Sequence, residues 1–307
     1  MDTMMKESVL DPGSEPRFAS VDGNSGNRRP AVTLPEKPLV TIRPRQSWVA
    51  LDLRSFWTYH ELLYFLIWRD VKVRYKQTVL GVAWAILQPV IMIAIFSVIF
   101  GRVAGLPSDG IPYALFAYAG VVTWTFFSGA VTKSGNSLVG SSHLITKVYF
   151  PRMLVPAAAV CAAVVDLILA FVVLVPLMFY YSVVPRWQIV TILPLIVLLI
   201  LLAFGVGMWM SALNVKYRDV GFILPFMIQI WMFLSPVIYP SSALPPKFRA
   251  VMMFNPVSGI IEASRSALFG LPFNWLAILI SGVITFLILA CAAFWFRRME
   301  REFADVV

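Results

Sequence analysis

The sequence contains little charge, little cysteine and little histidine. Only 13% of its 307 residues are charged, whereas 59% are hydrophobic. Soluble domains are nearer one quarter charged and one half apolar, so this composition excludes an ordinary soluble enzyme. The two cysteines, Cys161 and Cys291, lie inside apolar runs without His or carboxylate neighbours at metal-ligand spacing. The sequence therefore indicates neither a disulfide framework nor a zinc site.

Patterns of catalysis are also missing. Phosphate-cradling loops of ATPases combine glycines with a lysine after a strand. The segment GNSLVGSS at 135–142 has the glycines but lacks the lysine and follows an apolar run. His60 and His143 stand isolated, and no acid pair or HExxH pattern occurs. We therefore predict no catalytic residue, no metal site and no cofactor bound by this chain.

Long apolar runs are abundant instead. A helix needs about 20 apolar residues to cross a hydrocarbon core of about 30 Å. Six runs meet this length, at 78–100, 112–131, 153–181, 189–213, 220–239 and 275–296. The sequence thus predicts an all-α integral membrane protein with six transmembrane helices per chain.

Composition divides the chain into three parts. Residues 1–54 are rich in proline and polar residues and are predicted to form a disordered cytoplasmic tail. Residues 55–77 mix aromatic and basic side chains, which is typical of an amphipathic interface helix. Residues 78–300 form the predicted six-helix domain. Within it, the connection at 240–274 is long enough for short re-entrant helices, or it is a surface loop with an aromatic anchor.

Basic residues predict the orientation in the membrane. Of 25 Lys and Arg residues, 20 flank the spans on the side of the termini and 5 lie on the opposite side. Positive charge accumulates in cytoplasmic loops, so both termini are predicted to be cytoplasmic. The net charge of +9 is therefore assigned to membrane lipid headgroups rather than to nucleic acid.

Polar groups inside the spans are candidate functional residues. Asp166 is the single carboxylate within a predicted span, and Gln88 and Gln229 lie in two other spans. A charge in lipid is costly and needs a partner or water. We expect an interhelical hydrogen bond from Asp166 to Gln88 or Gln229; a channel-lining or proton-linked group is the alternative.

Two further acidic residues have basic neighbours at helical spacing. Asp70 and Arg74 are four residues apart, and Glu262 and Arg265 are three residues apart. Such spacings place side chains on the same helix face, so both are predicted as local ion pairs.

Aromatic residues are frequent in the second and fifth spans. Aromatic faces can stack on sugar rings, although headgroup belts and helix packing use most aromatics in membrane proteins. The candidates for lining a channel are Trp124, Phe127, Trp231, Phe233 and Tyr239.

Several ordered motifs carry a family resemblance over about residues 55–300. They are RDVKVRYKQTVLGVAWAILQPV, SLVGSSHLITKVYFPRMLVP, NVKYRDVGFILPF, SPVIYP and NPVSGIIEASRSALFG. Their sequence and order resemble the permease subunit of type-2 ABC exporters, in particular the exporters of lipid-linked O-antigen and teichoic acid in the bacterial cytoplasmic (inner) membrane.

This resemblance implies partners. It implies a homodimer of permeases with two separate ATP-binding cassette ATPase subunits, which hold the ATP and Mg. It also implies that the loop between spans two and three carries a coupling helix and that the next cytoplasmic loop makes a second contact. The implied ATPase contacts are Ser142, His143, Leu144, Ile145, Lys147, Asn214, Lys216, Tyr217, Arg218 and Asp219.

The resemblance also implies a route for substrate. Arg69, Asp70, Arg74 and Tyr75 of the interface helix would frame the cytoplasmic entry of a lipid pyrophosphate headgroup, since Arg can fork onto phosphate oxygens. A role in anchoring the helix to the surface, without substrate contact, is equally consistent with these residues.

A polymer longer than the bilayer is thick needs a continuous channel, which we place at the homodimer interface. The predicted function is therefore export of a lipid-linked polysaccharide, as in lipopolysaccharide biosynthesis. The alternatives are a type-2 exporter of a small lipid or drug and, less favoured, a membrane transferase acting on lipid-linked sugars.

Overall fold

The computed structural model describes residues 53–76 and 83–300, and all regular elements in these ranges are helices. The N-terminal and central elements are α1 (Leu53–Thr58), α2 (His60–Lys76), α3 (Ala83–Phe96), the π-helix η1 (Ser97–Val103), α4 (Tyr113–Gly140), α5 (Ser142–Lys147) and α6 (Leu154–Tyr180). The remaining elements are the 3-10 helix η2 (Trp187–Thr191), α7 (Ile192–Lys216), α8 (Val220–Phe233), the 3-10 helix η3 (Ser241–Ala243), α9 (Pro246–Met252), α10 (Pro256–Phe269) and α11 (Trp275–Glu300). This confirms the predicted all-α class.

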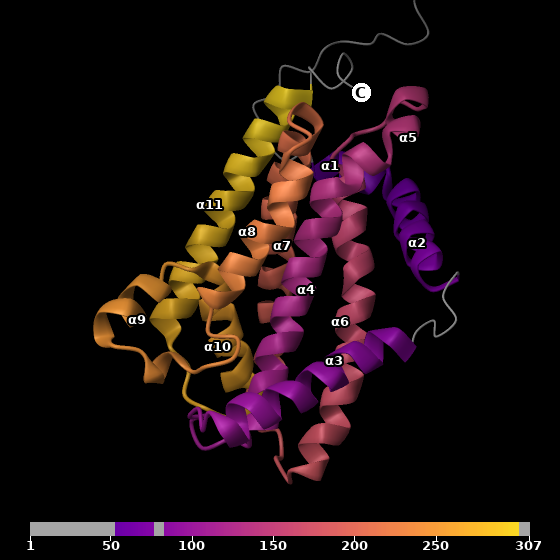
Figure 1. Ribbon diagram of the computed structural model, residues 1–307. Coiled ribbons are helices and arrows are strands. Elements are labelled where there is room, and N and C mark those ends of the chain that lie inside the picture. The colour runs from indigo at the N-terminus through magenta and orange to yellow at the C-terminus, as the bar shows by residue number, and fades with distance from the viewer. Residues whose placement is uncertain (1–52, 77–82, 301–307) are drawn as a thin grey trace, which may run out of the picture. The chain divides into compact units, whose positions relative to one another are not determined.

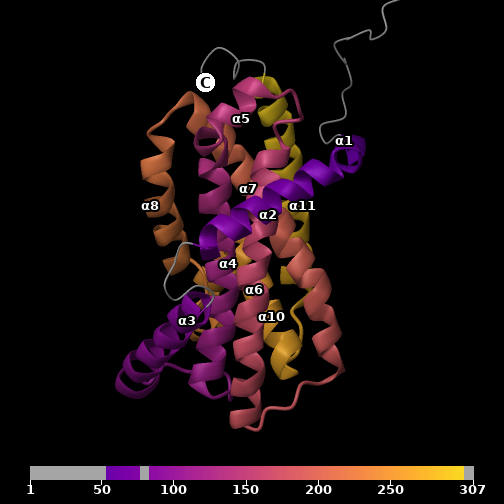
Figure 2. The same ribbon diagram turned by 90° about the vertical axis from the view of Figure 1, so that its right-hand side faces the viewer.

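Helix α4 is the centre of the packing. It contacts α6, α7 and α10, while α11 packs on α7 and α2 packs on α6 (Figures 1 and 2). Buried side chains occur along most of its length, including Phe116, Tyr118 and Phe127. The residues around α4 are therefore positioned by three neighbouring helices at once.

Within the described ranges, five segments are long and apolar enough to cross a membrane. They are Ile86–Val103, Tyr113–Gly140, Leu154–Tyr180, Trp187–Lys216 and Trp275–Glu300. They correspond to the predicted spans one to four and six, although the second extends nine residues beyond its predicted end at residue 131. The first five residues of the predicted span one, 78–82, lie outside the described residues.

The predicted fifth span at 220–239 differs from the observed helix. Helix α8 has 14 residues, which at about 1.5 Å per residue reach about 21 Å, short of a core of about 30 Å. After Phe233 the chain forms turns as far as Tyr239. Pro236 cannot donate the next helical hydrogen bond, which favours this end. A sixth crossing stays a prediction.

The predicted short helices before the last span are present. Helix α10 begins with Pro256, and the side chain of Asn255 caps it by accepting a hydrogen bond from the Val257 amide at 3.2 Å. Proline at the first position and Asn before it are the residues that helix starts prefer. Whether α9 and α10 re-enter the membrane stays a prediction.

Helices α1 and α2 occupy the predicted interface segment 55–77 up to Lys76. Several large apolar side chains of α2 are exposed, including Tyr64, Phe65 and Trp68, whereas Leu66 is buried. This two-sided pattern is typical of a helix at a membrane surface. The predicted tail lies outside the described residues up to residue 52, and the division of the chain at residues 54 and 77 stays a prediction.

Candidate functional site

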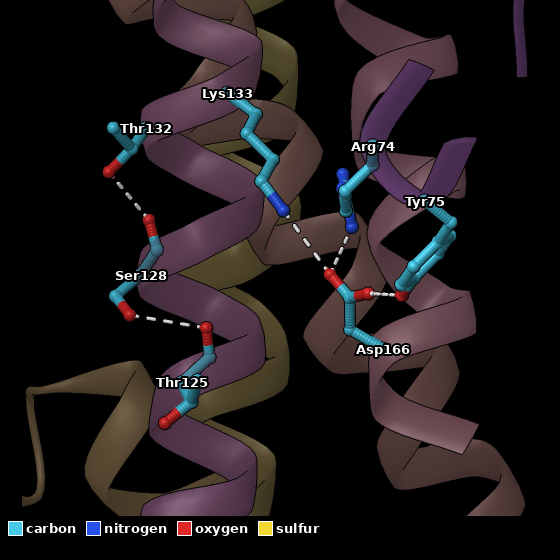
Figure 3. A network of polar contacts seen from close by, with 7 residues as sticks. All are labelled: Arg74, Tyr75, Thr125, Ser128, Thr132, Lys133 and Asp166. Atoms are coloured by element: carbon cyan, nitrogen blue, oxygen red, sulfur yellow. Dashed lines mark hydrogen bonds and ion pairs between the residues drawn. The ribbon is translucent and has the colours of Figure 1, made fainter. Parts of the chain in front are cut away.

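Asp166 is the centre of a charged cluster that joins three helices. Arg74 and Tyr75 of α2 both donate hydrogen bonds to its carboxylate. From α4, the Lys133 ammonium donates to Oδ2 of Asp166 at 3.2 Å. Figure 3 shows these side chains pointing toward one another from α2, α4 and α6. The expected interhelical contact of Asp166 exists, but its partners are these three residues rather than Gln88 or Gln229.

The cluster satisfies an otherwise costly group. Ten apolar residues of α6, from Pro156 to Val165, precede Asp166, and the Asp166 side chain is 31% exposed. Oδ2 accepts from both cations, and Oδ1 accepts from the Tyr75 hydroxyl. Burial, reinforced by the hydrogen bond to Asp166, raises the pKa of Tyr75 to about 12, so Tyr75 stays a neutral donor near pH 7.

A cavity of about 430 Å³ adjoins the cluster. Arg74, Lys133 and Asp166 lie at its polar part, together with Gln88 of α3 and Ser128 of α4. Its remaining lining is mostly apolar and includes Met92, Val121, Phe126 and Leu167. The cavity is therefore amphipathic, with a charged region and apolar walls.

Nearby hydroxyl groups of α4 are bonded within their own helix. Ser128 donates to the carbonyl of Thr125 at 3.2 Å, and Thr132 donates to the carbonyl of Ser128 at 2.7 Å (Figure 3). Ser and Thr commonly bond backward in this way inside helices. The cationic groups of Arg74 and Lys133 thus dominate the polar character of this region.

The other predicted entry residues form a separate pair on α2. Arg69 donates to Asp70 Oδ1 through Nη2 at 2.9 Å and through Nε at 3.0 Å. The predicted pair between Asp70 and Arg74 is therefore wrong, because Arg74 turns toward Asp166 of α6. The contact of Arg74 with the partly buried carboxylate of another helix overrides the local spacing to Asp70.

The predicted coupling residues Ser142, His143, Leu144, Ile145 and Lys147 form a distinct short helix, α5. Ile145 is buried in a core cluster with Leu66, Leu138 and Phe150, whereas Lys147 is exposed. The helix is thereby fixed by Ile145, with the half-buried Leu144 packed against the same cluster, and it presents polar residues outward. Its contact with an ATPase stays a prediction.

The second predicted contact lies between α7 and α8. Lys216, Tyr217, Arg218 and Asp219 are exposed there. Asn214 is buried instead, and its Nδ2 donates to the carbonyl of Gly135 at 3.1 Å and to Oδ1 of Asn136 at 3.0 Å. Asn214 therefore ties the end of α7 to the end of α4.

The five predicted channel aromatics fall into different environments. Trp124 and Phe127 are buried and contact each other, with ring centroids 5.6 Å apart. Trp231 packs edge-on against Phe127 and donates its indole N–H to Asn255. In this structure these three rings pack helices together.

The remaining two aromatics lie nearer the surface. Phe233 is 63% exposed at the end of α8, and Tyr239 is half-buried and donates to the Phe233 carbonyl at 2.9 Å. A channel-lining role for any of the five stays a prediction, and Phe233 is the most accessible to a passing molecule.

The predicted local ion pair between Glu262 and Arg265 of α10 is also wrong. Its guanidinium is buried and donates to the carbonyls of Phe116, Pro236 and Val237 rather than to Glu262. It also lies over the Phe116 ring, 3.6 Å from the centroid. Arg265 thus holds the turn after α8 against α4.

Lys133 is the site residue that sequence reasoning missed. Hydropathy falls after residue 131, which places Lys133 beyond the predicted second span, yet α4 continues to Gly140. Helices α4 and α6 are neighbours connected by a short segment, and residues at similar distances from that segment can meet. Two features of the sequence could have indicated this pair: Asp166 lies in the middle of the third predicted span, and Lys133 lies two residues after the end of the second.

The helical arrangement and these motifs can be compared with known proteins. A family profile described as ABC-2 type transporter matches residues 61–269, which is more than half of the chain. The chain belongs to the ABC-2 type transporter family. It is thus a multi-pass transporter component, and its cluster at Asp166 and its helix α5 both lie within the matched region.

Several characterised relatives resemble this ABC-2 transporter chain over most of its length. It is 26% identical over 248 residues to the O-antigen export system permease protein RfbA of Klebsiella pneumoniae, covering 80% of this chain and 95% of the relative. It is 26% identical over 261 residues to the protein of the same name from Myxococcus xanthus, covering 83% and 98%. It is 24% identical over 221 residues to the polysialic acid transport protein KpsM of Escherichia coli, covering 69% and 85%.

Proposed function

We propose that this chain is the permease subunit of an exporter that moves a lipid-linked, O-antigen-like polysaccharide across the bacterial cytoplasmic membrane. The observation that carries the proposal is its similarity to two O-antigen export permeases over 95% and 98% of their lengths. Similarity to a polysialic acid transport protein supports the same class of cargo, a long glycan.

Two copies of the chain form the transport unit in this proposal, with the channel between them. A long polymer needs an open path rather than a closed cavity. The 430 Å³ cavity at Asp166 is far too small for a polysaccharide. Helix α8 supports an interface role, since Phe222 and Phe226 are 84% and 61% exposed while Leu224 and Ile228 are buried.

Energy comes from ATP hydrolysis in separate subunits on the cytoplasmic side. Helix α5 and the exposed residues 216–219 are the proposed contacts, and the bond from Asn214 to Gly135 places the ends of α7 and α4 next to each other. Figure 2 shows α5 and the start of α8 at the same end of the helices, the end where α11 also finishes. This arrangement supports a common docking side, with both termini cytoplasmic.

The deciding experiment is co-purification followed by hydrolysis. A tagged full-length chain is expressed with its candidate ATPase, and the complex is reconstituted in lipid. We expect a complex of two permeases with two ATPases whose ATP hydrolysis changes when a purified lipid-linked glycan is added. The control is the same complex with a lipid that carries no glycan.

Two results would contradict the proposal. A complex that forms but hydrolyses ATP equally with and without glycan would favour export of a small lipid or drug. Absence of any complex would remove the coupling assignment and reopen a transferase function.

A further inference from the structure

The Asp166 cluster holds more positive charge than negative charge. Arg74 and Lys133 contribute two cations and Asp166 one carboxylate, so one positive charge is unmatched within the cluster. Both cations approach the same oxygen, Oδ2. Two like charges at this separation repel unless an anion lies between them. The site is therefore built around an anion, and its own carboxylate supplies only part of the required charge.

The adjoining cavity limits the size and shape of the ligand that this cluster can bind. Its volume of about 430 Å³ falls within the range of about 300–1,000 Å³ that is typical of small-ligand pockets. The walls contributed by α3, α4 and α6 are mostly apolar, and the cations lie at one region of the lining. A ligand that fits both features has an anionic group attached to an apolar chain.

Phosphate suits the donors better than a second carboxylate does. Arg forms two parallel hydrogen bonds with phosphate oxygens, and Lys acts as a point charge that phosphate accommodates easily. A phosphate group presents several oxygens, so it can serve Arg74 and Lys133 with different atoms. Tyr75 could keep its hydrogen bond to Oδ1 of Asp166 while Oδ2 is released.

We propose that the cavity binds the phosphate group of a lipid, and that Asp166 is a resident counter-ion which this phosphate displaces from Arg74 and Lys133. The inference rests on the proposed function, in which the cargo is lipid-linked. Arg74 and Lys133 bind the phosphate, the apolar walls contact the start of the lipid chain, and Asp166 keeps the two cations in place when the cavity holds no phosphate.

Direct binding tests the ligand chemistry. The full-length chain is reconstituted in nanodiscs of the phosphate-free lipid digalactosyldiacylglycerol, and binding of a radiolabelled polyprenyl phosphate is measured. We expect saturable binding, with the matching polyprenol at least about tenfold weaker because it lacks the charge-assisted hydrogen bonds. Equal binding of the polyprenol would overturn a phosphate site. Equally tight binding of inorganic phosphate would overturn the assignment to a lipid.

Substitutions test the roles of the individual residues. Lys133→Met should weaken binding of the polyprenyl phosphate by about tenfold or more, whereas Asp166→Asn should strengthen it by removing the competing carboxylate. Lys72→Met is the matched control, since Lys72 is exposed on α2 and does not line the cavity, and should leave binding unchanged.

Each substitution has a contradicting result. Equal weakening by Lys72→Met would mean that phosphate binds the basic helix surface in general. Weakening by Asp166→Asn would make Asp166 part of the binding site rather than a displaced counter-ion. If Asp166→Asn fails to fold, Lys133→Met still decides the phosphate site, because Lys133 is 41% exposed. Binding needs neither ATPase nor transport, so its failure is distinguishable from failure of the proposed export.

Discussion

At the scale of single residues, two charged side chains determine where helices of this protein meet. Asp166 and Arg265 are both polar residues in apolar surroundings, and they are satisfied differently. Asp166 meets side chains from α2 and α4, whereas Arg265 meets backbone carbonyls of α4 and of the turn after α8. Each fixes a point where helices distant in sequence come together.

Arg265→Met should destabilise the folded chain by about 2–4 kcal/mol, because it removes three hydrogen bonds and leaves the buried carbonyls of Pro236 and Val237 without a donor. The measurement is the thermal unfolding midpoint of the purified chain in detergent, which should fall. Arg249→Met is the matched control. Arg249 also donates to carbonyls, of Ser241 and Ser242, but it is exposed.

The Arg249 variant should stay close to the original midpoint, since exposed carbonyls find water. Equal midpoints for the two variants would show that burial of Arg265 does not determine its contribution. Gly120 belongs to the same contact: a Cβ at this position would lie 2.3 Å from Nη2 of Arg265 and 2.5 Å from the Val237 carbonyl oxygen. The space for the guanidinium thus depends on glycine.

Sequence reasoning found these residues but not their partners. A lone carboxylate in a span requires a partner, and that requirement alone identified Asp166. Choosing among Gln88, Gln229 and Lys133 requires knowing which helix faces meet. Spans that are apolar on all sides have little amphipathic pattern to show this. For Arg265, the local spacing to Glu262 suggested a pair that the tertiary structure replaces.

At the scale of elements, close helix contact depends on small residues. Helices α10 and α11 meet at Gly259, where a Cβ would lie 2.1 Å from Oγ of Ser281 and 2.9 Å from the carbonyl oxygen of Ala277. Small residues let membrane helices approach closely. Because the Ala277 carbonyl is part of the backbone, rotation of the Ser281 side chain alone cannot relieve the crowding.

Gly259→Ala should therefore separate α10 from α11 and destabilise the chain by about 1–3 kcal/mol, as overpacking does. The yield of monodisperse protein and its unfolding midpoint measure the effect. Gly282→Ala, one residue after Ser281 on α11, is the control, since a Cβ there meets no atom within 4 Å. A Gly259 variant as stable as the Gly282 variant would contradict the tight contact.

The sequence predicts short helices within 240–274 without their boundaries. In the structure Asn255 and Pro256 mark the start of α10, and both are residue types that helix starts prefer. The end of α4 was misplaced because Thr132, Lys133, Ser134 and Asn136 lower the hydropathy without ending the helix. Hydropathy reports the apolar part of a helix, and a helix can continue beyond that part.

At the scale of the whole molecule, the exposed cation of α5 tests the docking assignment. Lys147→Glu should reduce recovery of the ATPase with the tagged chain by about tenfold, because reversed charge at an interface opposes the partner's complementary charge. Pull-down in detergent measures this directly. Lys247→Glu, an exposed lysine of α9 in the predicted outer segment, should leave recovery unchanged.

Loss of ATPase recovery in both lysine variants would point to a general charge effect, and loss in neither would remove Lys147 from the contact. The unfolding midpoint of each variant provides the control for folding. Since Lys147 is exposed while Ile145 anchors α5 in the core, the charge can be changed without removing the helix itself.

The bond from Asn214 to Gly135 has a mechanical consequence. Because it links the ends of α7 and α4, we expect a displacement of α5 that moves the end of α4 to move residues 216–219 as well. The two proposed docking segments, α5 and residues 216–219, would then move together as one unit. A movement produced by one ATPase subunit would then displace α6 and α8 at the same time, since α6 follows α5 and α8 follows residues 216–219 in the chain.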